Sequence, residues 1–422
     1  MKTSSASAAI ASSTITHMVR TPATSRRAAI AAAILGVAAC STPLYDAAPP
    51  PRPAPTPAPA PATAAVTTGA SAPAAAAAAS PLVRTTPRAR WIGAAWGDLP
   101  GWTLDTTIHA WPALLRSCDK PAPDWLAACA SARALRDPDE ARVRQWLQAN
   151  LQPFRVESHD GQAEGLITGY FEPLIEATRV PRPGFQIPLH GPPADLATKK
   201  PWYTRAQIDT LPAARAALRG REIAWVGDPL DALVLQVQGS GRLVMNEADG
   251  RRRLLRAAYA GHNDHPYNSV GRWLVARGAF PLDQASWPMI KAWARANPQR
   301  VPEMLAVNPR YVFFREEPLP DPAVGPNGAQ GVPLTPGRSI AVDRDAVPYG
   351  TPVWIDTTEP TLPPAPPNGA PRPLQRLVVA QDTGSAITGA VRADYFWGWG
   401  DGAEDHAGRM KQPLRMWVLV PR

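Results

Sequence analysis

The pattern of apolar and polar residues changes from helix-like to strand-like at about Pro153. Before that point, residues 124–138 and 139–151 carry apolar side chains at helical spacing, which predicts two helices. Beyond it, short alternating runs bounded by Gly and Pro follow, such as 165–179 and 231–245, and these predict strands. The change indicates that most of the ordered chain is β.

Two further helical intervals interrupt the strand-like part. They cover 269–278, where Ser269 is a suitable N-cap, and 286–298. The pattern therefore predicts a mainly β protein with a few helices, built as barrels rather than as a parallel α/β sheet, with a long surface loop at 358–373. The remaining predicted strands are 310–316, 338–343, 351–356, 376–382 and 416–421.

The N-terminus has the features of an export signal. Arg26 and Arg27 precede an apolar run that ends at Cys40. The run has about a dozen residues, whereas a membrane-spanning helix needs about 20. We expect 1–39 to be a bacterial lipoprotein signal peptide and Cys40 to be lipidated; an ordinary signal peptide with an incidental cysteine is the alternative. Ser41, next to Cys40, favours an anchor in the outer membrane that faces the periplasm.

Residues 40–90 form a Pro/Ala-rich linker. Pro–Ala alternation cannot bury a core and favours extended polyproline II. At about 3.1 Å per residue, some 40 residues reach on the order of 120 Å. We therefore expect a disordered tether that holds a soluble domain away from the lipid surface.

After lipidation of Cys40, the chain would retain two cysteines, Cys118 and Cys129. In an exported protein, an even remainder at short spacing predicts a disulfide, and two buried free thiols are the alternative. No base lies nearby in the sequence, so we do not expect a cysteine-dependent enzyme.

Composition narrows the classes of partner. The formal net charge is +9, yet an exported protein with no basic helix and no nucleic-acid motif is not expected to bind nucleic acid. The chain has 15 Trp residues. Most are expected in the core, but a few exposed ones would suit sugar rings, whose apolar faces stack on aromatic side chains.

Two carboxylates stand out in the segment 380–400, AQDTGSAITGAVRADYFWGWG. Asp394 is followed by Tyr395, Phe396 and Trp397, while Asp382 ends an apolar strand. An apolar setting raises the pKa of a carboxyl group and suits a general acid, although a turn or capping role is the alternative for Asp394. Asp382 precedes a Thr–Gly turn, where a carboxylate accepts backbone N–H bonds.

Six motifs in one order resemble a known family. They are TGYFEP (168–173), QVQGSGR (236–242), YAGHNDHPYNSVG (259–271), NPRYVFF (308–314), PLTPGRSIAVD (333–343) and the 380–400 segment. Together they resemble the membrane-bound lytic murein transglycosylase A family, whose C-terminal part is a three-aspartate (3D) domain, here with Asp343, Asp382 and Asp394. The resemblance extends from about Trp91 to the C-terminus.

The resemblance implies a double-psi β-barrel main domain with an inserted second β-rich, barrel-like domain and a sugar-binding groove between them. Mapped onto this chain, the main domain comprises 91–173 and 307–422, and the family-specific insert covers 174–306. TGYFEP and NPRYVFF would be the two segments in which the chain passes between the main domain and the insert. Periodicity alone predicts only a β-rich chain with helical intervals.

The family reaction cleaves the β-1,4 bond between N-acetylmuramic acid and N-acetylglucosamine in peptidoglycan without water, leaving a 1,6-anhydro ring. The muramyl O6 is the nucleophile, so the second carboxylate of ordinary glycosidases is unnecessary. Asp394 stands where the family has its catalytic aspartate, and we expect it to act as general acid and then base. A hydrolytic glycosidase and a non-catalytic murein-binding lipoprotein are the alternatives.

The remaining expectations concern binding. Gln236 and Gln238 alternate on the predicted strand and would reach sugar hydroxyl or acetamido groups, and Arg242 would meet carboxylates of the substrate. We expect Asp382 to position Asp394 or a substrate hydroxyl, and Asp343 to be structural. His262 and His265 have metal-like spacing without a third ligand, so no metal or other cofactor is expected. The chain should be a monomer, with murein synthases as candidate partners. The further substrate-positioning candidates are Thr168, Tyr170, Ser240 and Tyr267.

Overall fold

The computed structural model describes residues 82–362 and 370–422. The expected signal segment 1–39, Cys40 and residues 41–81 of the linker lie outside the described residues, so these expectations stay predictions. The end of the linker at residue 90 is too late, because Val83–Thr85 already forms a strand that pairs with Arg90–Ile92. The middle of the expected surface loop at 358–373 lies outside them as well. Within the two described ranges, no helix combines the length and the apolar character needed to cross a bilayer.

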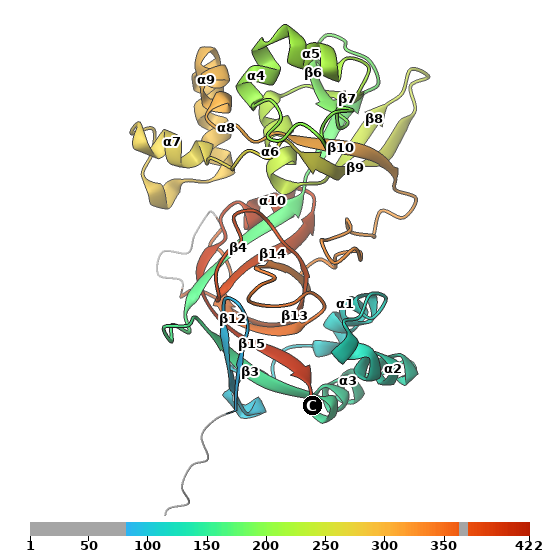
Figure 1. Cartoon of the computed structure of the whole chain (residues 1–422), viewed down its shortest axis with the longest axis vertical. Helices are drawn as coiled ribbons and strands as arrows, with labels where there is room; N and C mark the ends of the chain where they lie inside the picture. Colours follow the sequence, from blue (N-terminus) through green and yellow to red (C-terminus); the bar gives the residue numbers. More distant parts are fainter. Residues whose placement is uncertain (1–81, 363–369) are drawn as a thin grey trace, which may run out of the picture. The chain divides into compact units, whose positions relative to one another are not determined.

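Six strands of the larger sheet close into a ring (Figure 1). The sheet consists of β1 (Val83–Thr85), β2 (Arg90–Gly93), β3 (Leu151–Glu157), β4 (Gly165–Glu172), β11 (Ser339–Val342), β12 (Pro352–Thr358), β13 (Pro373–Asp382), β14 (Arg392–Trp399) and β15 (Lys411–Pro421). Its order is β1-β2-β3-β15-β12-β13-β11-β14-β4, and β4 also pairs with β15. Apolar side chains such as Ile167, Val342 and Met416 form its core. The predicted mainly β, barrel-like architecture is confirmed.

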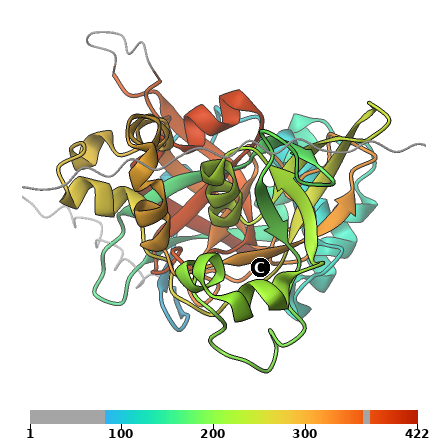
Figure 2. The same ribbon diagram turned by 90° about the horizontal axis from the view of Figure 1, so that it is seen from above.

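A second sheet has six strands in the order β10-β9-β8-β5-β7-β6. Figures 1 and 2 both show helices α7, α8 and α9 beside this sheet, at the end away from its protruding β8–β9 hairpin. Its core includes Leu189, Val226, Leu243 and Phe314. The strands are β5 (Leu174–Thr178), β6 (Ile187–His190), β7 (Glu222–Val226), β8 (Gly241–Asn246), β9 (Arg252–His262) and β10 (Val312–Pro318). The helices are α4 (Arg205–Thr210), α5 (Pro212–Leu218), α6 (Pro229–Gln238), α7 (Val270–Ala276), α8 (Trp287–Ala296) and α9 (Val301–Ala306).

Three helices cover the barrel near β12, β13 and β15. They are α1 (Trp111–Ser117), α2 (Leu126–Ala134) and α3 (Glu140–Asn150), and their apolar side chains pack on Trp354 and Trp417. Cys118, which follows α1, forms a disulfide with Cys129 in α2. The helices predicted over 124–138 and 139–151 are confirmed. A last helix, α10 (Asp401–Ala407), lies against β4 and β14.

The strand predicted over 231–245 is wrong in its first half, because residues 229–238 form helix α6. Asp228 caps the start of α6 by accepting a 2.8 Å hydrogen bond from the N–H of Leu230, and Gly239 ends it with a left-handed φ of 84°. A short apolar run fits either a strand or a buried helix, and here the two caps favour the helix. The Ser269 cap of α7 is as predicted, since its side chain accepts from the N–H of Arg272.

The chain passes directly from β4 to β5 through Pro173, and it returns later than expected. Strand β10 pairs with β9, with Val312 opposite His262, so the six-stranded sheet continues to Pro318. The end of the insert at residue 306 is therefore too early: NPRYVFF runs into the second sheet, and 319–338 carries the return to β11. Strand pairing between distant segments decides this boundary, and local sequence does not encode it.

Candidate active site

Strands β4 and β14 run parallel, and their register places Thr168 opposite Asp394. Thr168 Oγ1 donates a 2.6 Å hydrogen bond to Asp394 Oδ1 and accepts one of 2.9 Å from Arg392 Nη2. The next residue, Gly169, has room for no side chain, because a Cβ there would lie 2.8 Å from Nε1 of Trp397. Two strands distant in sequence thus hold the Asp394 carboxylate in a defined orientation.

Burial raises the pKa of Asp394 to about 6 from its ordinary value of 3.8. The hydrogen bond from Thr168 and the charge of Arg392 oppose this rise in the pKa, and the negative charge of Asp382 adds to it. A carboxyl group with this pKa is partly protonated near neutral pH. It can therefore donate a proton and later accept one.

Asp382 lies at the end of β13, and both of its carboxylate oxygens are engaged. Oδ2 accepts a 3.0 Å hydrogen bond from the Tyr170 hydroxyl, and Oδ1 accepts one of 2.9 Å from the backbone N–H of Ala329. The ring of Tyr170 packs on Phe396, with 5.2 Å between centroids. Burial raises the pKa of Asp382, and the hydrogen bonds oppose this rise. Asp382 is thus fixed in place and interacts electrostatically with Asp394.

Two adjoining cavities, which together we name the groove, give access to these acids. One has a volume of about 790 Å³ and is lined by Asp382, Tyr170 and Ser240, among others. The other has about 140 Å³ and is lined by Asp394 and Tyr267. The two cavities share lining residues from α6 of the second sheet's domain and from the loop that follows β13. Polar and apolar groups both line this space, as is usual for a ligand-binding site.

Arg242, which we expected to meet substrate carboxylates, lies elsewhere. Its side chain is 2% exposed, and its Nε donates a 2.7 Å hydrogen bond to Glu172. Arg256 donates to the other oxygen of Glu172 at 2.6 Å, and the guanidinium of Arg242 lies 3.7 Å above the ring of Trp399. A buried charge needs a partner of opposite charge. The pair with Glu172 meets this need and links β8 to the end of β4. The expected contact of Arg242 with substrate carboxylates is wrong.

The two glutamines do not share a strand face, because α6 is a helix. Gln236 is buried and accepts a hydrogen bond from Arg205. Gln238 accepts a 3.0 Å hydrogen bond from the backbone N–H of Phe171. Both line the groove, but these internal bonds use their carbonyl oxygens. A direct role of either side chain in sugar binding stays a prediction for its amide N–H group.

The other candidates have structural partners. Asp343 accepts hydrogen bonds from the backbone N–H groups of Gly389 at 2.8 Å and of Asp345 at 3.1 Å, which agrees with a structural role. The ring nitrogen of His262 contacts the N–H of Asp264, and that of His265 contacts a backbone carbonyl. Across the described residues, no three His, Cys, Asp or Glu side chains gather as metal ligands do.

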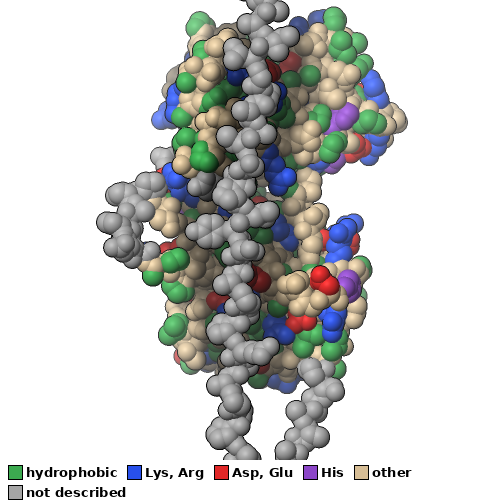
Figure 3. Space-filling model, turned by 90° about the vertical axis from the view of Figure 1, so that its left-hand side faces the viewer, with side chains coloured by type: hydrophobic (Ala, Val, Ile, Leu, Met, Phe, Trp, Pro, Cys, Tyr) green, Lys and Arg blue, Asp and Glu red, His purple; other side chains and the backbone are tan. Residues whose placement is uncertain are grey.

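Sequence reasoning missed several groove residues, and three of them have side chains suited to bind a ligand. Arg310 lines both cavities, while Lys120 and Tyr259 line the larger one. Arg310 and Tyr259 lie in motifs that the sequence analysis quoted, NPRYVFF and YAGHNDHPYNSVG, but nothing local distinguishes a groove cation from a solvated one. On the surface drawn in Figure 3, outside the part that grey atoms cover, Lys and Arg side chains are scattered rather than gathered in one patch. The fold, and not a basic stretch of sequence, therefore brings Lys120 and Arg310 to the groove.

Comparison with known proteins agrees with this architecture. Residues 166–315 match the model of the MltA specific insert domain, and residues 338–420 match that of the 3D domain. A relative from Vibrio cholerae, named membrane-bound lytic murein transglycosylase A, is 33% identical over 68% of this chain and 72% of its own length.

Two solved structures extend the likeness. A lytic transglycosylase, LtgG, of Burkholderia pseudomallei is 45% identical, with a TM-score of 0.55 over 83% of this chain and all of that chain. Escherichia coli MltA with bound chitohexaose is 28% identical, with a TM-score of 0.55 over 75% of this chain and 86% of that chain. The names of these relatives agree with the predicted enzyme class. The chain belongs to the membrane-bound lytic murein transglycosylase A family.

Proposed function

We propose that this protein is a peptidoglycan lytic transglycosylase that cleaves the β-1,4 bond between N-acetylmuramic acid and N-acetylglucosamine without water. The observation that carries the proposal is the Asp394 carboxyl group, which lines the groove with a pKa raised to about 6. The names of the relatives support this reaction, and the relative with bound chitohexaose supports a glycan strand as the ligand.

Asp394 performs both proton transfers. The protonated carboxyl group donates its proton to the glycosidic oxygen as the C1–O bond breaks, so that N-acetylglucosamine leaves with a free hydroxyl group. The muramyl O6 then forms a bond to C1, and the Asp394 carboxylate removes the O6 proton. Atoms and charges balance, and the acid is regenerated. The nucleophile belongs to the same sugar, which gives the ring closure a large effective molarity.

Asp382 has a positioning role in this mechanism. A hydrolytic glycosidase of the common type needs a second carboxylate that is free to activate water or to attack the sugar. Both oxygens of Asp382 already accept hydrogen bonds, from Tyr170 and from the N–H of Ala329. The Asp382 charge also raises the pKa of Asp394. We therefore assign Asp382 to holding the site and raising the pKa of Asp394, and not to attack on the sugar.

Arg310 takes the place that the sequence suggested for Arg242. It lines the same small cavity as Asp394 and donates to the backbone carbonyl of His265 at 3.1 Å. Its positive charge would pair with the lactyl or peptide carboxylate of a muramyl residue bound in this cavity. Tyr267 and Ser240 would contact the sugars themselves. The groove would thus distinguish murein from a neutral glycan.

The finer fold and location belong to the same proposal. The closed ring of β15-β12-β13-β11-β14-β4 contains two parallel pairs, β11 with β13 and β14 with β4, which supports a double-psi barrel. The main domain would comprise 91–173 and the part after the return to β11. The protein would be a monomer anchored in the outer membrane through lipidated Cys40, and it would need no cofactor.

Product analysis tests the reaction. Purified protein is incubated with murein sacculi, and the released muropeptides are identified by mass spectrometry. We expect 1,6-anhydromuramyl ends, which are lighter by one water than the reducing ends that a hydrolase leaves. The variant Asp394→Asn should release none, whereas Asp345→Asn, a change at an exposed acid of the barrel, should behave as the unmodified protein.

Three outcomes would contradict the proposal. Reducing ends in place of anhydro ends would identify a hydrolase. Undiminished release by Asp394→Asn would remove the role of this residue, and failure of the unmodified protein to release any muropeptide would favour a murein-binding lipoprotein.

A further inference from the structure

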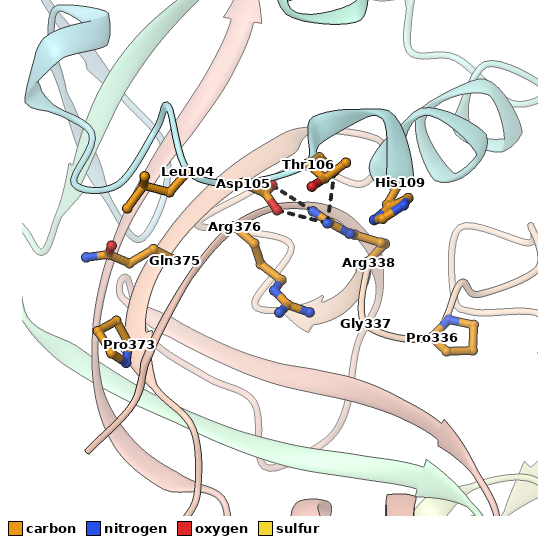
Figure 4. A pocket seen from close by; sticks show the side chains of 10 residues that line it. All are labelled: Leu104, Asp105, Thr106, His109, Pro336, Gly337, Arg338, Pro373, Gln375 and Arg376. Carbon is orange, nitrogen blue, oxygen red and sulfur yellow. Dashed lines mark hydrogen bonds and ion pairs between the residues drawn. The ribbon is translucent and has the colours of Figure 1, made fainter. Parts of the chain in front are cut away.

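A cavity of about 690 Å³ lies apart from the groove (Figure 4). It is bounded by residues 104–109, by 336–338 and by the start of β13, and none of its lining residues lines the groove cavities. Arg376 in this cavity precedes Asp382 by six residues on β13, which corresponds to about 20 Å at 3.3 Å per residue. The cavity is therefore a separate place on the barrel.

One of its two arginines is fully paired. Arg338 Nη1 and Nη2 contact the two carboxylate oxygens of Asp105 at 2.7 and 2.9 Å, and both side chains are nearly buried. The same guanidinium donates to the backbone carbonyls of Leu377 and Thr106. Its charge and its donors are thus used within the fold, and it forms a rigid wall of the cavity.

The other arginine, Arg376, is fixed but keeps its charge available. Its Nη1 donates a 2.9 Å hydrogen bond to the hydroxyl of Tyr395, which in turn donates to the carbonyl of Gly337 at 2.8 Å. Within the described residues, Arg376 forms no ion pair with a carboxylate. Its neighbours do, since Arg338 pairs with Asp105 and Arg415 pairs with Asp356. Figure 4 shows its guanidinium group extending into the middle of the cavity.

The charge and the rim of the cavity define the ligand. Two arginines and one aspartate leave one net positive charge, which suits a single carboxylate rather than a more highly charged phosphate. A guanidinium fork matches the geometry of a carboxylate, and the bond to Tyr395 occupies only one of the five N–H donors of Arg376. Leu104, which is 82% exposed, and the rings of Pro336 and Pro373 add apolar surface. The volume lies within the usual range for small-ligand sites, about 300–1,000 Å³.

We propose that this cavity binds a carboxylate of a short peptide. The ligand is a stem peptide of murein, carried by a glycan strand other than the one bound in the groove. The identity of the ligand rests on the proposed function, since murein brings many such peptides near the groove. A second contact on the same polymer lengthens the residence of the enzyme, because the second binding step becomes intramolecular. Arg376 acts as the anchor of this peptide.

The test measures binding of the tetrapeptide L-Ala–γ-D-Glu–meso-diaminopimelate–D-Ala to the full chain by isothermal titration calorimetry. The Asp394→Asn background is used throughout, and the second ligand is the same peptide with all its carboxylates amidated. We expect saturable binding of the free peptide and none of the amidated peptide. Arg376→Gln should weaken binding about tenfold, as expected for a lost charge-assisted hydrogen bond.

Leu104→Asp places a negative charge on the rim at an exposed position, so it tests the site without disturbing the contact between Arg376 and Tyr395. It should weaken binding at least as much, whereas Arg136→Gln, at an exposed arginine of the same domain, should leave affinity unchanged. Equal affinity of the amidated peptide, or unchanged affinity in both cavity variants, would overturn the proposal.

An unrelated L-peptide with a free carboxylate that binds equally well would overturn the assignment to murein. Product analysis with Asp394 variants is independent of these results. A failure of the second site is therefore distinguishable from a failure of the proposed reaction.

Discussion

Replacing the Asp394 carboxylate by an amide should stabilise the fold at alkaline pH while it abolishes activity. The pKa of Asp394 is raised from 3.8 to about 6, chiefly by burial, so the folded protein binds this proton more tightly than the unfolded chain does. Ionised Asp394 therefore destabilises the native state. Asp394→Asn keeps the shape and can still accept the hydrogen bond from Thr168, but it carries no charge to bury.

The size of the effect depends on pH in a defined direction. Below the unfolded pKa both states are protonated and the penalty is absent. It develops as the pH rises from 3.8 to about 6 and is complete above that. A difference of about 2.2 pKa units at 1.36 kcal/mol each gives roughly 3 kcal/mol at pH 8 and less than about 1 kcal/mol at pH 4. Asp394 lines an open cavity, so solvent screening makes this an upper limit.

Urea unfolding at pH 4 and pH 8 measures this difference directly. Unmodified protein, Asp394→Asn and Asp345→Asn are compared by linear extrapolation to water. We expect Asp394→Asn to exceed the unmodified protein in its free energy of unfolding at pH 8 and to approach it at pH 4, with Asp345→Asn unchanged at both. An Asp394→Asn variant that is equally or less stable than the unmodified protein at pH 8 would refute the buried, destabilising carboxylate on which the mechanism depends.

Three further predictions concern neighbouring residues. Thr168→Val removes the 2.6 Å hydrogen bond that stabilises ionised Asp394, so its pKa should rise by about one unit. Activity, which needs the protonated acid, should then persist to a correspondingly higher pH in turbidity assays of murein, and Thr168→Ser should keep the original profile. Glu172→Gln leaves two buried arginines without a counter-charge and should cost about 3–5 kcal/mol in urea unfolding; a loss under about 1 kcal/mol would contradict the buried ion pairs. Arg310→Gln, in the Asp394→Asn background, should weaken binding of soluble muropeptides about tenfold without changing the affinity for neutral chitohexaose, and an equal loss for both ligands would exclude recognition of carboxylates.

The wrong predictions share one physical cause: each concerns a feature that the side chains within the quoted run do not determine. The run at 231–245 has apolar residues that fit a strand or a buried helix, and only the caps at Asp228 and Gly239 separate the two structures. Strand alternation would place Gln236 and Gln238 on one face, but both residues belong to helix α6, so this inference is wrong. The positive charge of Arg242 suggests a contact with substrate carboxylates, but nothing local shows that Glu172, 70 residues earlier, is its partner.

The sequence alone determined the elements that local physics controls. Helical spacing defined α2 and α3, Ser269 fixed the start of α7, and alternation defined the strand that ends at Asp382, whereas the strand that carries Asp394, β14, was not among the predicted ones. The order of the motifs also indicated the family. These features depend on neighbours within a few residues, whose side chains and backbone interact whatever the rest of the chain does.

Only the tertiary structure decided which groups meet. The contact between Thr168 and Asp394 joins residues 226 positions apart, and that between Tyr170 and Asp382 joins residues 212 positions apart. The parallel pairing of β4 with β14 places Thr168 opposite Asp394, and the same strand β4 carries Tyr170 to Asp382. The pKa of a carboxyl group depends on what buries it and which charges surround it, so the chemistry of Asp394 exists only once distant strands have paired.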